Sequence, residues 1–281
     1  MRFAFFPIFF ALFAAALPGR AQEAAPDAKA ELRAAMNPRA ATAEELAQLN
    51  ALLHKVADDY QRWAYTERRV MRDEKGKLKS GLLLRFDPSK PYPEQWTPLS
   101  VNGKAPSERD LRKYREMGER QAPPDFARPV SSDPKNRRRP TLGEALDLPR
   151  SSVAAESATH LLFDLALLKF GNERFPPEKF QVLARVRKDG WVLENIAVKL
   201  RESFRSKLIV KVKSGEGALD FAQVDPKHPP ALVALNGDAS ASVFFVSIGG
   251  AMALHRTELK HVKPYDERFD VQIGTLKAID F

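Results

Sequence analysis

The chain has 281 residues, of which 44% are hydrophobic and 29% are charged, with no cysteine and a formal net charge of +9. This much apolar material can build a core, which excludes a wholly disordered or fibrous chain. Without cysteine there is no disulfide framework, no cysteine-ligated metal or iron–sulfur centre and no thiol nucleophile.

The first residues have the pattern of an export signal. Arg2 precedes an almost unbroken run of Phe, Ala, Leu and Ile over residues 3–17, and Gly19 and Ala21 place small residues where a signal peptidase reads them. The apolar run of about 15 residues is shorter than the roughly 20 that a spanning helix needs. We therefore expect cleavage after Ala21 and a periplasmic or secreted protein of residues 22–281, rather than a retained N-terminal anchor.

Export changes the meaning of the basic charge. Outside the cytosol of a bacterium the available polyanions are lipid headgroups, lipopolysaccharide and acidic polymers. The densest basic run is Lys135, Arg137, Arg138 and Arg139, inside the proline-rich stretch 121–150. It is either a solvated loop or a contact with an anionic membrane surface or an envelope protein. No aromatic side chains are interleaved with it, so we expect no nucleic-acid partner.

The N-terminal half predicts two helices and three strands. Residues 22–41 are alanine-rich and expected to be loosely ordered. Thr42 and Glu45 form a capping-box pattern, and an apolar stripe at helical spacing follows to Tyr60, which predicts an amphipathic helix. Aromatic and β-branched residues predict strands at 63–71, 78–86 and 96–101. Ser107 and Asp110 can cap a second, short helix before the long loop 121–150.

The C-terminal half alternates apolar and polar residues, which is typical of strands. Strands are expected at 161–167, 182–187, 196–201, 208–213, 218–224, 241–248, 252–262 and 268–276. Asp189-Gly190 predicts a two-residue type I′ hairpin turn. The fold class is therefore mainly β (α+β): a curled antiparallel sheet or half-barrel of roughly ten strands, with two helices over its open apolar side. Residues 42–281 form one domain in this reading, although the loop 121–150 also allows two.

This layout resembles the periplasmic lipoprotein carriers and their relatives, the outer-membrane lipoprotein-sorting proteins and the sigma-factor regulators that share their half-barrel. The resemblance rests on the helix at 42–60, the hairpin at 63–86, the Asp189-Gly190 hairpin and Val224-Asp225-Pro226. In that family the apolar concave face holds acyl chains. The resemblance therefore implies a lipid or lipoprotein acyl chain as ligand, while the insertion at 121–150 departs from the carrier pattern.

Acyl chains bind apolar walls at about 0.8 kcal/mol per buried CH₂ and need no polar motif. The candidate wall is the set of inward-alternating residues Val182, Val186, Ile196, Val198, Leu208, Val210, Phe244 and Val246. The same residues would also fill the core of any closed barrel or sandwich.

Catalytic signatures are absent from the sequence, with no HExxH, GxSxG or P-loop string. His160 and Asp164 lie about 13 Å apart if they share a strand. His255 and His261 are separated too far along a strand to share a metal. Of the remaining histidines, His54 falls on the first helix and His228 in a proline-rich turn, and the adjacent Asp58 and Asp59 diverge. We therefore expect no enzyme, no cofactor and no metal site, although a hydrolase assembled from scattered residues would leave no signal.

The main expectation is an exported, non-enzymatic protein of the bacterial cell envelope that binds a lipid-like or apolar ligand in a concave sheet. One alternative is an envelope interaction protein with a filled core and a basic docking loop. Another is an outer-membrane barrel, because the chain ends in Phe281. Only Trp191 and Tyr265 could build aromatic girdles after residue 151, which disfavours the barrel.

Overall fold

The computed structural model describes residues 36–121, 143–169, 176–206, 210–243 and 246–268. The described α-helices are α2 (Ala43–Asp59) and α3 (Glu108–Gln121). The strands are β1 (Met36–Ala40), β2 (Trp63–Asp73), β3 (Leu78–Phe86), β4 (Trp96–Val101), β5 (Ser152–Glu156), β6 (His160–Leu165), β7 (Phe180–Arg187), β8 (Val192–Leu200), β9 (Phe204–Ser206), β10 (Val210–Ala222), β11 (Ala231–Val243) and β12 (Val246–His261).

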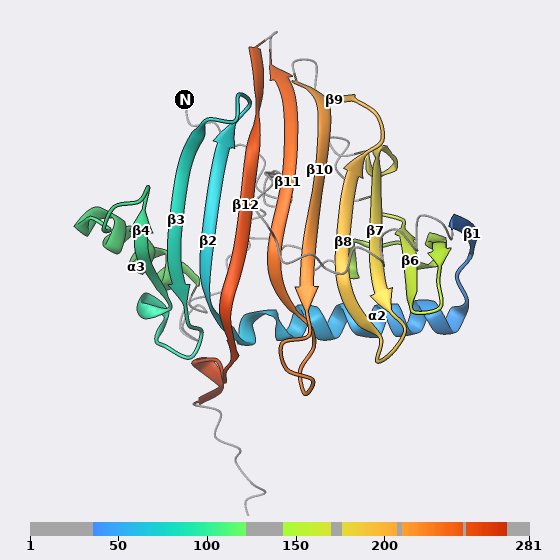
Figure 1. Ribbon diagram of the computed structural model, residues 1–281, viewed down its shortest axis with the longest axis horizontal. Coiled ribbons are helices and arrows are strands. Elements are labelled where there is room, and N and C mark those ends of the chain that lie inside the picture. Colours follow the sequence, from blue (N-terminus) through green and yellow to red (C-terminus); the bar gives the residue numbers. More distant parts are fainter. Residues whose placement is uncertain (1–35, 122–142, 170–175, 207–209, 244–245, 269–281) are drawn as a thin grey trace, which may run out of the picture.

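All of these strands belong to one 12-stranded antiparallel sheet (Figure 1). Their order is β1-β5-β6-β7-β8-β10-β11-β12-β2-β3-β4, with β9 paired to β10 off this path. Strands β1 and β4 are the two edges, so the sheet is open. Helix α2 runs across one end of the strands from the β1 side to β2, and α3 lies beside β4 (Figure 1). This confirms the mainly β class, the antiparallel open sheet and the two helices.

Helix α2 begins where the capping box predicts. The backbone N–H of Thr42 donates to Glu45 at 2.8 Å, and the N–H of Glu45 donates to Thr42 Oγ1 at 3.1 Å. These bonds satisfy amides that the first helical turn leaves free. Leu49, Leu52 and Leu53 are then buried against the sheet.

The main core lies between α2 and the strands β5 to β8. Strand β7 alternates strictly between buried and half-buried residues, so that one face packs and the other carries its polar side chains. The buried set comprises Leu49, Leu52, Leu53, Leu146, Val153, Leu161, Phe163, Leu165, Phe180, Val182, Ala184, Val186, Leu193, Ile196, Val198 and Leu200. Helix α2 owes its position to this layer, because a single amphipathic helix is marginal without tertiary packing.

A second cluster holds α3 against the same face of the sheet, at strands β2 to β4. Tyr65, Leu84 and Phe86 are buried there, and Tyr114 of α3 packs on them. Gly118 of α3 approaches the backbone of Tyr92 so closely that a Cβ atom would lie 1.9 Å from its carbonyl oxygen. The helix can therefore take this position only with glycine at 118.

Several boundaries differ from the sequence expectation. The segments 208–213 and 218–224 merge into the single strand β10, because Gly215 and Gly217 continue the ladder instead of breaking it. The expected strand 241–248 is wrong: Val243 pairs with Val246, so a hairpin connection divides it. The short strands β1, β5 and β9 and most of β11 (residues 231–240) were not expected, and β1 lies inside the stretch 22–41.

The Asp189-Gly190 hairpin joins β7 and β8 as predicted, but its turn is not type I′. That type needs a positive φ at both central residues, whereas the positive values here belong to Gly190 (71°) and Trp191 (50°). The predicted signal segment, most of the loop 121–150 and the last residues of the expected strand 268–276 lie outside the described residues. Among the described helices, none is long and apolar enough to cross a membrane.

Candidate functional site

The predicted wall residues on β7 and β8 lie in the core beneath α2. Val182, Val186, Ile196 and Val198 are at most 7% exposed and pack with its leucines. They therefore line no open cavity in this structure. Val210 is half-buried at the start of β10 and pairs with Val243.

The other predicted contacts are not placed by the structure. Leu208, Phe244 and the basic run Lys135, Arg137, Arg138 and Arg139 lie outside the described residues, as does the side chain of Val246.

Beyond α2, the same face of the sheet carries small and flexible apolar residues. Leu219 and Ala239 pack at the edge of the α2 core, so residues two positions away on their strands share this face. One cross-strand row on it consists of Gly217, Gly237, Met252, Met71 and Ser80. Met71 and Met252 are half-buried. The two glycines leave the sheet without side chains at that level, and we call these five residues the glycine row.

A small pocket separates the end of α2 from β11 and β12. Its walls are Val56, Tyr60, Trp63, Pro230, Ala231, Leu232 and Arg256. It has room for about one water molecule, which is too little for an acyl chain. An apolar ligand would therefore need the face that carries the glycine row.

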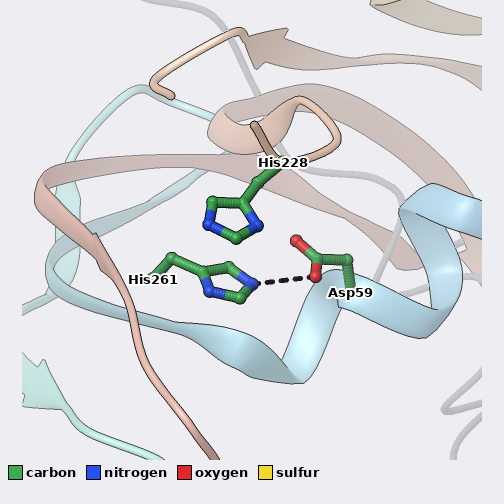
Figure 2. Close-up of side chains that lie close together, drawn as sticks. All are labelled: Asp59, His228 and His261. Carbon is green, nitrogen blue, oxygen red and sulfur yellow. Dashed lines mark hydrogen bonds and ion pairs between the residues drawn. The ribbon is translucent and has the colours of Figure 1, made fainter. Parts of the chain in front are cut away.

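Next to this pocket, at its Trp63 wall, a carboxylate and two imidazoles meet. Asp59 is the last residue of α2, His228 lies in the connection between β10 and β11, and His261 is the last residue of β12. Their ligand atoms all lie within 4.8 Å of one another. Figure 2 shows the carboxylate beside the same edge of the two rings. We call these three residues the Asp–His–His cluster.

The two rings of the cluster are stacked, with centroids 3.5 Å apart and planes inclined by 11°. The ring N–H at Nε2 of His261 donates to Oδ1 of Asp59 at 2.9 Å, and the indole N–H of Trp63 donates to Oδ2 at 2.8 Å. Both carboxylate oxygens are thus held in place. The side chains of Asp59 and His261 are 13% and 19% exposed.

The connection that carries His228 is also held firmly. The side-chain amide of Gln223 donates to the carbonyls of Asp225 and His228 at 2.9 and 2.5 Å. The ring of His228 makes no hydrogen bond to a described residue, and its Nε2 lies 3.9 Å from Oδ2 of Asp225. A stacked imidazole with no hydrogen-bond partner among the described residues is the feature of the cluster that packing alone does not explain.

The remaining titratable residues considered in the sequence have separate partners. His160 binds Thr159 and Glu194, whereas Asp164 accepts from Gln181 and Arg201. His255 and His54 are exposed and stand apart from the Asp–His–His cluster. Residue spacing had indicated that none of these residues would meet as pairs. The structure instead joins Asp59, His228 and His261, which no spacing linked.

Sequence reasoning missed this cluster because its members come from three distant segments. Only the strand order, which places β12 between β11 and β2, brings the ends of α2 and β12 and the β10–β11 connection together. The single local signal was a histidine in the turn after Asp225-Pro226. Comparisons with protein-family models, with curated proteins and with solved structures found no match to this chain.

Proposed function

We propose that this protein is a non-enzymatic binding protein of the cell envelope, which holds a lipid-like ligand on the sheet face beside α2. The observation that supports this best is the glycine row. Gly217 and Gly237 lower the floor of the sheet, and Met71 and Met252 flank it with unbranched side chains that adapt to irregular apolar shapes.

The surroundings of the row suit an acyl chain better than a compact polar ligand. Leu219, Leu235, Leu254 and Leu82 form part of the next cross-strand row, and Ile248 further along β12 is 42% exposed. Each methylene that such a surface covers contributes about 0.8 kcal/mol. Arg69 belongs to the same row as these leucines, and one of its nitrogens pairs with Glu67 at 2.5 Å. Its Nε has no hydrogen-bond partner among the described residues and is left for a carboxylate or phosphate head group.

Two adjacent residues of β12 give a matched test. Met252 belongs to the glycine row, whereas Ala253 points to the opposite face of the sheet and is also half-buried. In a titration with a fluorescent fatty acid, we expect Met252→Arg to abolish uptake and Ala253→Arg to keep it. Circular dichroism of both variants controls for folding.

A wild-type chain that takes up no fatty acid, and that gives a clean apo mass by gentle mass spectrometry after purification from its host, would defeat the proposal. Equal loss of uptake in both variants would show that the glycine row is not where the ligand lies.

The filled core beneath α2 favours a second candidate, an envelope interaction protein that holds no small ligand. Val182 and its neighbours leave no space there, and the nearby pocket holds about one water molecule. Under this candidate the basic run docks the protein on an anionic surface. Deletion of residues 135–139 should then weaken binding to anionic liposomes at low salt, and unchanged binding would reject the idea.

Export remains part of both candidates. The signal-like segment 1–21 supports it, and the test is the N-terminal sequence of the protein recovered from the periplasm or medium. We expect the chain to begin at Gln22. A full-length chain in the cytosol would contradict an envelope role of either kind.

A further inference from the structure

We propose that the Asp–His–His cluster is a zinc site that ties the end of α2 to the sheet. Two imidazole nitrogens and one carboxylate oxygen are a ligand set typical of Zn²⁺, whereas Ca²⁺ and Mg²⁺ prefer oxygen ligands alone. The inference is independent of the proposed ligand on the other part of the sheet.

The separation of the stacked rings is close to that of two ligands on one ion. Ligands at 2.0–2.1 Å from a tetrahedral zinc ion lie about 3.3 Å from each other. Two nearly parallel imidazoles with centroids 3.5 Å apart can present nitrogens at about this separation. All three ligand atoms lie within 4.8 Å of one another, but the in-plane lone pairs of parallel rings do not converge. The ring of His228 must therefore turn out of the stack to bind the same ion as His261.

The hydrogen bond between His261 and Asp59 marks the place of the ion. A proton now joins Nε2 and Oδ1 across 2.9 Å. Zinc would replace that proton and add the ring of His228, which has no hydrogen-bond partner among the described residues. The proton would move to Nδ1 of His261, because a neutral imidazole keeps one N–H when its other nitrogen binds a metal.

Neighbouring groups are arranged as outer-shell partners. The indole of Trp63 fixes Oδ2 of Asp59 at 2.8 Å, so that Oδ1 faces the imidazoles. The carboxylate of Asp225 lies 3.9 Å from Nε2 of His228. Ligands held by hydrogen bonds, with carboxylates near the second nitrogen of a histidine, are a regular part of metal sites. Since the side chain of His228 is 31% exposed, an ion can enter from solvent and keep a water ligand.

The charge at the end of α2 gives a separate reason for a cation. Asp59 and Asp58 stand in the last turn of the helix, which contains no basic residue. Carboxylates at this end face the negative pole of the helix dipole, where cations are favoured. A zinc ion bound by Asp59 would offset this unfavourable arrangement.

The experiment uses tag-free full-length protein that has been treated with a chelator and dialysed, and then titrated with zinc chloride by calorimetry. We expect one zinc ion per chain. His228→Ala and His261→Ala should weaken binding by roughly tenfold or more, while His255→Ala on the exposed face of β12 should bind as the wild type does. Zinc should also raise the melting temperature of the wild type and not that of His228→Ala.

Two further measurements guard against a loss that only reflects misfolding. His228 lies in a surface connection, so its variant should keep the wild-type circular dichroism spectrum. Cobalt bound to the wild type should give the visible absorption of a tetrahedral site with nitrogen and oxygen ligands. Absence of a wild-type zinc site, or equal zinc affinity in His228→Ala and His255→Ala, would overturn the inference.

Discussion

Arg256 and Glu67 form an ion pair inside the layer of side chains between the sheet and its helices. Nε of Arg256 donates to Glu67 at 3.1 Å, and their side chains are 6% and 1% exposed. The guanidinium also lies 3.9 Å above the ring of Tyr65 and donates to the hydroxyl of Tyr60 at 2.9 Å. Burial raises the pKa of Tyr65 well above its usual value. A charge pair this deep depends on every one of these partners.

Removal of one partner should therefore cost far more than replacement of both. We expect Glu67→Leu or Arg256→Met alone to lower the free energy of unfolding by about 3–5 kcal/mol, because the remaining charge stays buried without its main counter-ion. Arg69 still contacts Glu67, and Tyr60 still contacts Arg256, but neither replaces the lost charge pair. The double variant Glu67→Leu/Arg256→Met should lose less free energy of unfolding than the two single variants lose together. Urea unfolding of the four proteins measures the coupling.

The exposed pair between Arg85 and Glu258 provides the control, since the Glu258 side chain is 71% exposed. Arg85→Met should change the free energy of unfolding by less than about 1 kcal/mol. A loss at Arg256 no larger than the loss at Arg85 would contradict the importance of burial.

Acid should weaken the attachment of α2. The hydrogen bond from Arg39 lowers the pKa of Glu45 to about 2, against about 4.5 in the unfolded chain. A carboxylate with a lowered pKa stabilises the fold above pH 4.5, and this contribution is lost as the pH falls toward 2. Between pH 5 and pH 3, Glu45→Gln should therefore lose less stability than the wild type, by about 1 kcal/mol.

Thermal melts at the two pH values measure this difference. Arg39→Gln removes the cation that lowers the pKa of Glu45. The stability of this variant should therefore also change less between pH 5 and pH 3 than that of the wild type. The idea is rejected if the melting temperature of Glu45→Gln falls as steeply with pH as that of the wild type.

Packing of α2 on β5 to β8 should dominate the stability of this half of the sheet. Leu49 is fully buried, so Leu49→Ala should cost about 2–5 kcal/mol in free energy of unfolding. Leu111 of α3 is 36% exposed, and Leu111→Ala should cost less than about 1 kcal/mol. Chemical denaturation distinguishes the two, and similar losses would mean that α2 does not rest on its leucines.

The β7–β8 turn should favour glycine at position 190. Gly190 has a φ of 71°, where a Cβ atom is strained, so Gly190→Ala should cost about 1 kcal/mol. Gly81 has ordinary backbone geometry and open space around it. Gly81→Ala should therefore leave the melting temperature unchanged or raise it. A neutral Gly190→Ala would argue against the left-handed turn.

Local patterns predicted the elements that carry strong local signals. The capping box at Thr42 and the apolar stripe after it located α2, and β3 and β4 have the expected bounds. Strands β1 and β5 have five residues each and β9 has three, which is too few to show an alternation. The boundary between β11 and β12 was missed because residues 241–248 contain no Gly, Pro, Asn or Asp to mark a turn.

The candidate sites were harder to predict because they depend on which strands are neighbours. Alternation indicated that Val182 and Val198 point inward, but it could not tell a filled core from an open wall. The Asp–His–His cluster and the Arg256–Glu67 pair depend on the β12–β2 pairing, and no local sequence pattern near these residues predicts that pairing. Long-range pairing is decided by the fit of the whole sheet and not by local preference.

The β12–β2 pairing also sets the order in which the protein can be completed. Glu67 and Arg256 are partners across 189 positions of the chain, and β12 is the last described strand to leave the ribosome. Until it arrives, β2 and β11 each present an open ladder of amides and carbonyls, the kind of edge that other chains can join. A chain cut before β12 would leave two separate sheets. Keeping the chain unfolded, for example on a chaperone, until β12 is available would therefore protect the exposed edges of β2 and β11 from aggregation.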